Sequence, residues 1–210
     1  CLQKFEEYSP LLEGYVAKSF HNLRSFLAYQ EGDDAAAIMW ARKGIDKVMH
    51  KVADRLEDPE RKDRKRVILP VGFVRQHHMT CVPATLTTIS KFWNRKAEHL
   101  QVADEICYNG TTAHAERKWA EENGWATQDF TVTEESTTRL IDAGVPFTLT
   151  TTDVGSGHLQ AVIGYDGRRG SLIIRDPYVR NKREMFAEGL TEDYGVFGPR
   201  GMAMVPKAEA

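Results

Sequence analysis

Cysteine is scarce in this chain of 210 residues, which contains only three: Cys1, Cys81 and Cys107. Three cysteines cannot all pair within one chain, and no closely spaced set is present, so a small disulfide-stapled scaffold is excluded. His77 and His78 lie close to Cys81, but no second pair of Cys or His residues follows at the spacing of a structural zinc site. We therefore expect no bound metal.

Long apolar runs and a strong net charge are also missing. No stretch is long and apolar enough to span a bilayer, and no secretory signal peptide is recognisable, so no membrane span is expected. The formal net charge of −2 argues against nucleic acid or a membrane surface as the main partner. With 41% hydrophobic and 28% charged residues, the chain has the composition of a globular protein that can bury a sizeable core.

A starting methionine is absent, because the chain begins at Cys1. We expect an excised fragment, with a processed form as the alternative, since a lipoprotein matured at its cysteine would begin in the same way. The length suits one large domain, or a medium-sized domain with an appendage. Both a cytoplasmic and an exported soluble protein are compatible with this composition.

The first part of the chain is predicted to be helical. Within residues 1–58 apolar residues recur at spacings of three and four, which is typical of amphipathic helices. Ser9-Pro10 suits a helix start, and the break at Gly32 is followed by Asp33, which can cap a second helix. We therefore predict a helical hairpin in this segment.

The predicted hairpin resembles the second half of a tetratricopeptide repeat through Gly32, Asp33, Ala37 and Gly44. In that repeat family small residues let two helices approach closely, and a single repeat is not stable alone because each unit buries one face on its neighbours. The resemblance implies that the hairpin ends a longer array or packs on the following domain. A protein partner that binds through these helices is a further expectation. A plain amphipathic hairpin is the alternative.

An almost wholly charged run, residues 59–66, follows the helices. Such a run is typical of a solvated linker and marks a domain boundary. Contact with nucleic acid, and cleavage after the basic residues as in a propeptide, are the weaker alternatives. We therefore predict a second domain over residues 67–210.

The pattern in the second domain predicts an α+β fold, in which helices come first and an antiparallel sheet follows. The expected helices span residues 81–93, 98–107, 112–123 and 134–143. The expected strands span residues 67–71, 130–133, 147–151, 159–165, 171–175 and 202–205. The turn-rich residues 166–170 join two of these strands as a hairpin.

One stretch of this domain carries the pattern of a reactive cysteine. Gln76 precedes Cys81 by five residues, and a helical apolar pattern with Pro83 in its first turn begins at the cysteine. The positive end of a helix dipole favours a thiolate, so we expect a lowered pKa for Cys81. The side chain of Gln76 is placed to donate a hydrogen bond to an oxyanion formed beside the sulfur.

Two later residues complete a candidate nucleophilic site. His158 follows a glycine at the head of an apolar run, and Asp176 ends the neighbouring run eighteen residues later. Strands joined by the hairpin at 166–170 would bring the two side chains together at one end of the sheet. A cysteine nucleophile, a histidine base and a carboxylate that orients the base are the groups that acyl transfer requires.

On these motifs the sequence resembles papain-like cysteine peptidases, and among them the bacteriocin-processing family that removes double-glycine leader peptides. The resemblance covers residues 67–206. The matching positions are Gln76, Cys81-Val82-Pro83, Gly157-His158, Gly164-Tyr165-Asp166 and Asp176-Pro177. Val82 replaces the glycine usual in the family, and Gln76 lies five rather than the usual six residues before the cysteine.

The resemblance implies a bacterial cysteine peptidase with a papain-like fold, which acts on a peptide or protein substrate without a metal or organic cofactor. Cys81 would attack an amide carbonyl, and His158 would take the thiol proton. Asp176 would hold the imidazole, while Gln76 and the cysteine N–H would stabilise the oxyanion. A transglutaminase-like acyl transferase and a catalytically silent peptide-binding module are the alternatives, and the complete Cys–His–Asp set argues against the silent module.

The remaining histidines, the tryptophans and the third cysteine are predicted to have structural positions. Helix-surface positions are expected for His21, His50, His99 and His114. A core position is expected for Cys107, and packing roles are expected for Trp93, Trp119 and Trp125. His77 and His78 are expected to line the cleft or face solvent.

Overall fold

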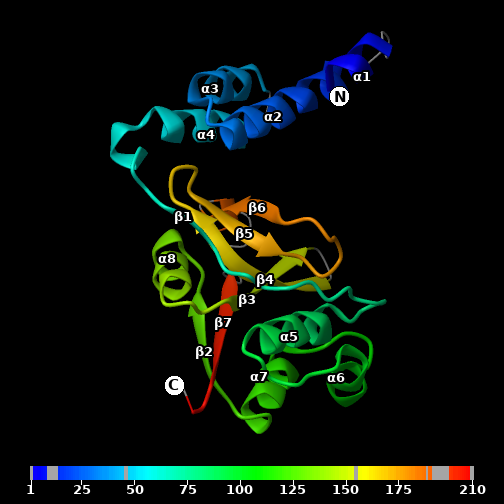
Figure 1. Cartoon of the computed structure of the whole chain (residues 1–210). Coiled ribbons are helices and arrows are strands. Elements are labelled where there is room, and N and C mark those ends of the chain that lie inside the picture. The colour runs from blue at the N-terminus through cyan, green and yellow to red at the C-terminus, as the bar shows by residue number, and fades with distance from the viewer. Residues whose placement is uncertain are drawn as a thin grey trace. The chain divides into compact units, whose positions relative to one another are not determined.

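The chain folds as two compact units (Figure 1). The computed structural model describes residues 2–8, 14–44, 47–153, 156–187, 189–190 and 199–208. The first unit comprises Cys1–Lys65 with the short segment Gly167–Gly170, and the second comprises Arg66–Asp166 with Ser171–Ala210. Cys1 and the predicted helix start at Ser9-Pro10 lie outside the described residues.

Helices make up the first unit. They are α1 (Leu2–Tyr8), α2 (Gly14–Glu31), α3 (Asp34–Lys43), α4 (Lys47–Glu57) and a 3-10 turn at Pro59–Arg61. The predicted second helix of the hairpin is two helices, α3 and α4, because the backbone becomes extended at Gly44 (φ −64°, ψ 158°) and ends α3. Asp33 caps α3 as predicted, since its carboxylate accepts a hydrogen bond from the N–H of Ala36 at 2.9 Å.

Helices α2 and α3 approach each other closely. Ala37 and Ala41 are fully buried, and the hydroxyl of Ser25 donates a hydrogen bond to the carbonyl of Ala37 at 2.8 Å. A Cβ atom at Gly44 would lie 2.7 Å from Oδ1 of Asn22, so a side chain there would force the neighbour to move. Small residues therefore occupy the contact between the helices, while the tetratricopeptide assignment stays a prediction.

A seven-stranded sheet forms the centre of the second unit. Its strands are β1 (Arg66–Ile68), β2 (Trp125–Thr131), β3 (Phe147–Asp153), β4 (Ser156–Asp166), β5 (Ser171–Arg175), β6 (Arg183–Phe186) and β7 (Arg200–Pro206). The order across the sheet is β2-β7-β3-β4-β5-β6, and β1 pairs with β4. Every one of these pairs is antiparallel, as the sequence predicted.

Helices cover both faces of this sheet (Figure 1). Three helices, α5 (Cys81–Phe92), α6 (His99–Ile106) and α7 (Ala113–Glu122), pack on one face, and α8 (Glu134–Asp142) packs on the other. Side chains of β5 alternate between the two cores, because Ile173 lies in the first and Leu172 and Ile174 lie in the second. The α+β fold class with a helix packed on an antiparallel sheet is therefore confirmed.

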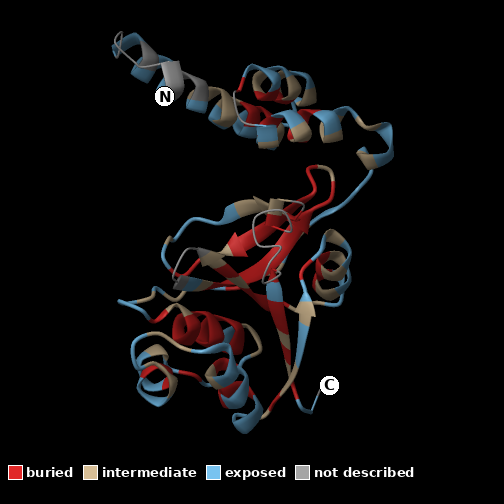
Figure 2. Cartoon of the chain, turned by 180° about the vertical axis from the view of Figure 1, so that it is seen from behind, coloured by how far each residue is buried: buried red, intermediate tan, exposed pale blue. Residues whose placement is uncertain are grey.

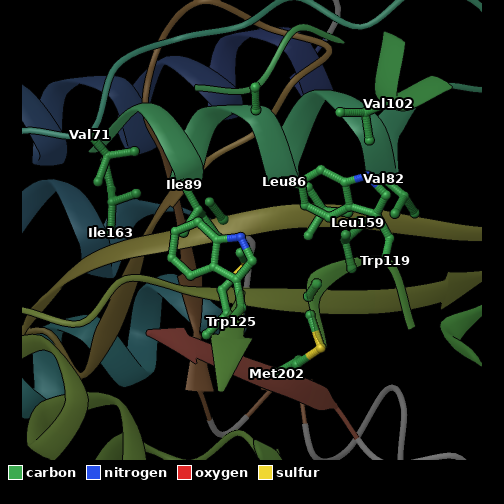
Figure 3. Packing of buried hydrophobic residues seen from close by; sticks show 14 of the residues in the cluster. Val71, Val82, Leu86, Ile89, Val102, Trp119, Trp125, Leu159, Ile163 and Met202 are labelled. Atoms are coloured by element: carbon green, nitrogen blue, oxygen red, sulfur yellow. The ribbon is translucent and has the colours of Figure 1, made fainter. Parts of the chain in front are cut away.

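Helix α5 is the most deeply buried helix of the second unit (Figure 2). Its residues from Val82 to Ser90 are all buried. Leu86 and Ile89 pack in a cluster with Leu159 of β4, and Trp119 and Trp125 lie in the same cluster (Figure 3). Full burial of each Leu or Ile contributes roughly 1.5–3 kcal/mol, so this packing fixes the helix and the residue at its start.

The Gly-Tyr-Asp motif at residues 164–166 has a structural role. A Cβ atom at Gly164 would lie 2.3 Å from the carbonyl oxygen of Val67, so glycine is what allows β1 to lie against β4. Asp166 is fully buried, and one of its carboxylate oxygens lies 3.5 Å from Nε of Arg66. Arg66 therefore begins the sheet, whereas the charged run 59–66 predicted a solvated linker up to that residue.

The predicted helices of the second unit agree with the observed ones to within one residue at each end. The strands were predicted less completely. Strand β2 begins at Trp125 rather than at residue 130, and β6 was not predicted at all. Within the described residues, no helix combines the length and the apolar character needed to cross a membrane.

Candidate active site

Cys81 is the first residue of α5, and its side chain is half-buried at the positive end of that helix. The hydroxyl of Thr85, one turn further on, donates a hydrogen bond to the carbonyl of Leu159 at 3.1 Å in the protein interior. Because Leu159 directly follows His158 in β4, this bond holds the cysteine helix against the strand that carries the histidine.

His158 and Asp176 meet at one end of the sheet. Arg175, the last residue of β5, pairs with Ala161 of β4, so the following residue emerges beside the start of β4. Nε2 of His158 lies 2.9 Å from Oδ1 of Asp176. The two side chains are therefore in contact, as the length of the hairpin between them predicted.

The carboxylate of Asp176 is buried, with 2% of the side chain exposed, and it has three hydrogen-bond donors. Besides His158, the N–H of Tyr178 donates at 2.8 Å and Nη1 of Arg183 donates at 2.9 Å. Burial raises the pKa of Asp176, but these donors outweigh it and lower the pKa to about 2. The group is therefore a fixed negative charge behind the imidazole.

The thiol of Cys81 and the imidazole of His158 interact, and each shifts the pKa of the other. Since Nε2 of the imidazole faces Asp176, Nδ1 is the ring nitrogen that remains for the sulfur. The bonds with Asp176 and Cys81 raise the pKa of His158 to about 9. Burial raises the pKa of Cys81, but the bond with His158 and backbone N–H groups, chiefly that of Leu159, outweigh it and lower the pKa. Both shifts act in favour of the thiolate form of Cys81 and the imidazolium form of His158.

Gln76 lies on the same side of the molecule as this pair, in the wall of one cleft with Cys81 and His158. Its backbone N–H donates to the carbonyl of Pro177 at 3.0 Å, which ties the glutamine to the residue after Asp176. Its Oε1 atom is buried and has no hydrogen-bond partner among the described residues. The side-chain amide is therefore held in the cleft wall with capacity for another hydrogen bond.

The cleft has a volume of about 1010 Å³, which is large enough for several residues of a peptide. Its walls come from the loop before α5, from the start of α7 and from the first residues of β4. His77 and His78 also line it, as predicted. Val82 contributes to the wall but is 6% exposed and packs in the core next to α5, so its side chain is directed into the protein.

The sequence model of the Peptidase_C39 like family matches residues 68–200. The chain belongs to the Peptidase_C39 like family. No curated protein matches its sequence.

Two solved structures share the fold of this family member. The peptidase domain of Streptococcus ComA, a bi-functional ABC transporter of a quorum-sensing pathway, is 19% identical with a TM-score of 0.51, over 65% of this chain and 98% of that domain. A double glycine motif protease from an AMS/PCAT transporter, solved in complex with the leader peptide, is 17% identical with a TM-score of 0.51, over 69% of this chain and 96% of the protease.

Membership of the Peptidase_C39 like family makes the chain a relative of cysteine peptidases and confirms the family resemblance that the motifs carried. The mixed arrangement of helices and an antiparallel sheet is the papain-like fold of these peptidases. The motif order in the sequence (Gln, Cys, His, Asp) therefore led to the right fold at low overall identity.

Two residues near the candidate site were not predicted from the sequence of this Peptidase_C39 like family member. Arg183 contacts Asp176 from β6, a strand of only four residues that gave no recognisable pattern. Glu116 of α7 lies buried in the cleft wall. A signal for Glu116 was present, because it stands three and four residues before Trp119 and Ala120, on the apolar face of its helix.

Two predictions near the cysteine are wrong. His99 is half-buried instead of lying on the helix surface: its ring stacks on that of His77, with centroids 5.4 Å apart, and its Nε2 lies 2.9 Å from Oγ1 of Thr80. Cys107 is half-buried rather than in the core, because it follows the last turn of α6 and its Sγ donates to the carbonyl of Met79 at 3.3 Å. These contacts hold the loop that joins Gln76 to α5.

A metal site at His77, His78 and Cys81 was the alternative prediction for these residues. Among the residues that the structure describes, no group of three or more His, Cys, Asp or Glu side chains is arranged to hold a metal ion. The packing roles predicted for the tryptophans are confirmed, since Trp119 and Trp125 are buried and Trp93 packs against the same cluster.

Proposed function

We propose that this chain is a cysteine peptidase that hydrolyses a peptide bond, with Cys81 as nucleophile, His158 as acid and base, and Asp176 as the group that orients the imidazole. The observation that carries the proposal is that Cys81 and His158 line one large cleft and that Nε2 of His158 lies 2.9 Å from Oδ1 of Asp176. The peptidase family and the two peptidase domains of the same fold support this reaction class.

The acylation step follows from the charge state of the pair. The thiolate attacks the carbonyl carbon, a C–S bond forms, and the carbonyl electron pair moves onto oxygen. The imidazolium of His158 donates its proton to the amide nitrogen, the C–N bond breaks, and the amine leaves. A thioester between the substrate acyl group and Cys81 remains.

Water completes the reaction. His158, now neutral, takes a proton from water, and the hydroxide oxygen adds to the thioester carbonyl. The C–S bond breaks, the carboxylic acid leaves, and the thiolate and imidazolium are restored. Asp176 stays ionised throughout, because its low pKa and its three donors hold it as a carboxylate.

Gln76 is proposed as the oxyanion donor together with the N–H of Cys81. Both steps develop negative charge on the carbonyl oxygen, and donors aimed at that oxygen stabilise the transition state. The position of Gln76 in the cleft wall and the bond from its N–H to Pro177 support this role. Its spacing of five residues from Cys81 is accommodated by the loop that His99 and Thr80 hold.

A hydrolysis assay tests the proposal. Quenched fluorescent peptides, including a double-glycine leader peptide, are incubated with the wild-type chain and with Cys81→Ser and His158→Ala. Turnover is expected to fall by about 10⁴-fold or more in both variants, whereas Cys107→Ser, which changes the other described cysteine, should keep it. Incorporation of a labelled amine in preference to hydrolysis would identify a transglutaminase-like acyl transferase, and peptide binding without turnover would identify a silent module.

A further inference from the structure

A buried carboxylate lies in the wall of the cleft at a distance from the cysteine. Glu116 is on α7 and is 5% exposed, yet it lines the same cleft as Cys81 and His158. It also lines a second, smaller pocket of about 320 Å³. A charged side chain in such a position is rare, because an ionised carboxylate is costly to remove from water.

The carboxylate of Glu116 has few partners. The hydroxyl of Thr148 donates to Oε1 at 3.0 Å. No ion-pair partner for it is present in the part of the chain that the structure describes, since the neighbouring Arg117 pairs with Asp129. A carboxylate can accept about four hydrogen bonds, so most of the capacity of this one is unused.

The environment of Glu116 brings the pKa of its carboxyl group close to neutral pH. Burial raises the pKa of Glu116 to about 7, although the Thr148 bond and the charge of Arg117 act in the opposite direction. A cation that entered the cleft would interact with the ionised carboxylate in place of the water that burial has removed. This interaction would be strong, because solvent screens charges only weakly at a buried site. The site therefore has the chemistry to bind a positive charge.

The fold places this carboxylate within reach of an extended peptide. Its partner Thr148 lies three residues before Thr151 along β3, and Thr151 pairs with His158. Three strand residues span roughly 10 Å at about 3.4 Å each. An extended substrate advances a similar distance per residue, so the group faces a substrate position within about three residues of the reacting bond.

We infer that Glu116 forms a subsite for a lysine or arginine side chain of the substrate, within about three residues of the bond that is cleaved. Thr148 orients the carboxylate, and the neighbouring Thr150, which lines both the cleft and the smaller pocket, supplies part of the wall. The inference rests on the proposed peptidase function and deepens it, because it assigns the class of residue that the cleft selects.

Positional peptide mixtures test this subsite. Eight-residue quenched peptides carry lysine, arginine, norleucine or glutamate at one fixed position and equal mixtures elsewhere, and cleavage sites are read by mass spectrometry at pH 8. Wild type is expected to prefer lysine or arginine over norleucine by at least about tenfold at one position. Glu116→Gln, which keeps an acceptor for Thr148, should lose this preference, while Glu122→Gln on the same helix outside the cleft should keep it.

A binding arm separates the failure of the subsite from the failure of the peptidase function. The same mixtures are passed over immobilised Cys81→Ala protein with and without Glu116→Gln, after equal thermal stability of the two has been verified. Enrichment of basic residues that disappears with Glu116→Gln supports the subsite, even where no turnover is found. Turnover or retention without a basic preference, or an equal preference in Glu116→Gln, overturns the subsite and leaves the peptidase proposal standing on its own assay.

Discussion

At the scale of single residues, the charge of Asp176 controls the protonation of the candidate site. The carboxylate is buried behind the imidazole and is held by Tyr178 and Arg183, so it cannot turn away from His158. Its bond is the largest contribution to the raised pKa of His158. The imidazolium in turn lowers the pKa of Cys81.

The variant Asp176→Asn tests this chain of effects. An amide accepts a hydrogen bond but carries no charge, so the pKa of His158 should fall from about 9 towards its ordinary value of about 6.5. Imidazolium is present below the histidine pKa, so the alkaline limb of kcat/KM should move to lower pH. At pH 8 kcat/KM should fall roughly thirtyfold.

The pH profile of peptide hydrolysis provides this measurement. Asp142→Asn is the matched control, because that carboxylate accepts a hydrogen bond from the hydroxyl of Tyr165 and does not line the cleft. An alkaline limb that stays in place in Asp176→Asn would show that the carboxylate does not set the histidine pKa.

At the scale of elements, one buried hydrogen bond joins the cysteine helix to the histidine strand. The hydroxyl of Thr85 in α5 donates to the carbonyl of Leu159 in β4 at 3.1 Å, and Leu159 directly follows His158. Most of the other contact between α5 and the sheet is apolar and therefore without direction. This bond is therefore expected to set the position of Cys81 along β4.

Thr85→Val should reduce both stability and cysteine reactivity. The substitution keeps the shape of the side chain but leaves the Leu159 carbonyl without its partner, at a cost of about 1–3 kcal/mol in the free energy of unfolding. Thr88→Val is the control, because the Thr88 hydroxyl bonds back to Ala84 within the same helix. Urea unfolding and the rate of Cys81 alkylation measure the two effects. An equal loss in both variants would contradict a specific role for Thr85.

The sequence predicted what depends on local pattern and spacing. Helix α5 follows from the apolar pattern after Cys81, and the meeting of His158 with Asp176 follows from the length of one hairpin. Contacts that depend on three-dimensional packing were not predictable in this way. Strand β6 is short and carries two charged residues, so its own sequence does not indicate a strand, and its pairing with β5 appears only in the fold.

The position of Glu116 could not be derived from its helix alone. Its burial depends on β3, which brings Thr148 against α7 from more than thirty residues away in the sequence. The division between α3 and α4 was missed for a different reason, since the apolar spacing continues across the break while the backbone at Gly44 does not stay helical.

At the scale of the whole molecule, the candidate site lies in one of the two units. Gln76, Cys81, His158 and Asp176 all belong to the second unit, which has two apolar clusters of its own. The helical first unit has a separate set of buried residues, among them Ala37, Ala41 and Val52 in α3 and α4. The predicted domain boundary near residue 66 is a proposal. A role for the helices of the first unit in binding a partner is a second proposal.

A chain that lacks residues 1–65 should keep the candidate site. Because the second unit has its own core, it is expected to unfold cooperatively by itself and to alkylate Cys81 within about twofold of the full chain. Thermal unfolding and alkylation rates measure this, with the full chain as the control. A truncated chain that folds but loses cysteine reactivity would show that the helical unit takes part in the site.

The pH dependence of Cys81 alkylation tests the central claim most directly. Iodoacetamide is reacted with the wild-type chain and with His158→Ala from acidic to alkaline pH, and labelling at Cys81 is quantified by mass spectrometry. We predict rapid labelling well below the free-cysteine pKa of about 8.5, which is lost in His158→Ala. Labelling that is no faster than that of a free thiol, and unchanged by the substitution, would contradict an activated Cys81–His158 pair and with it the peptidase function.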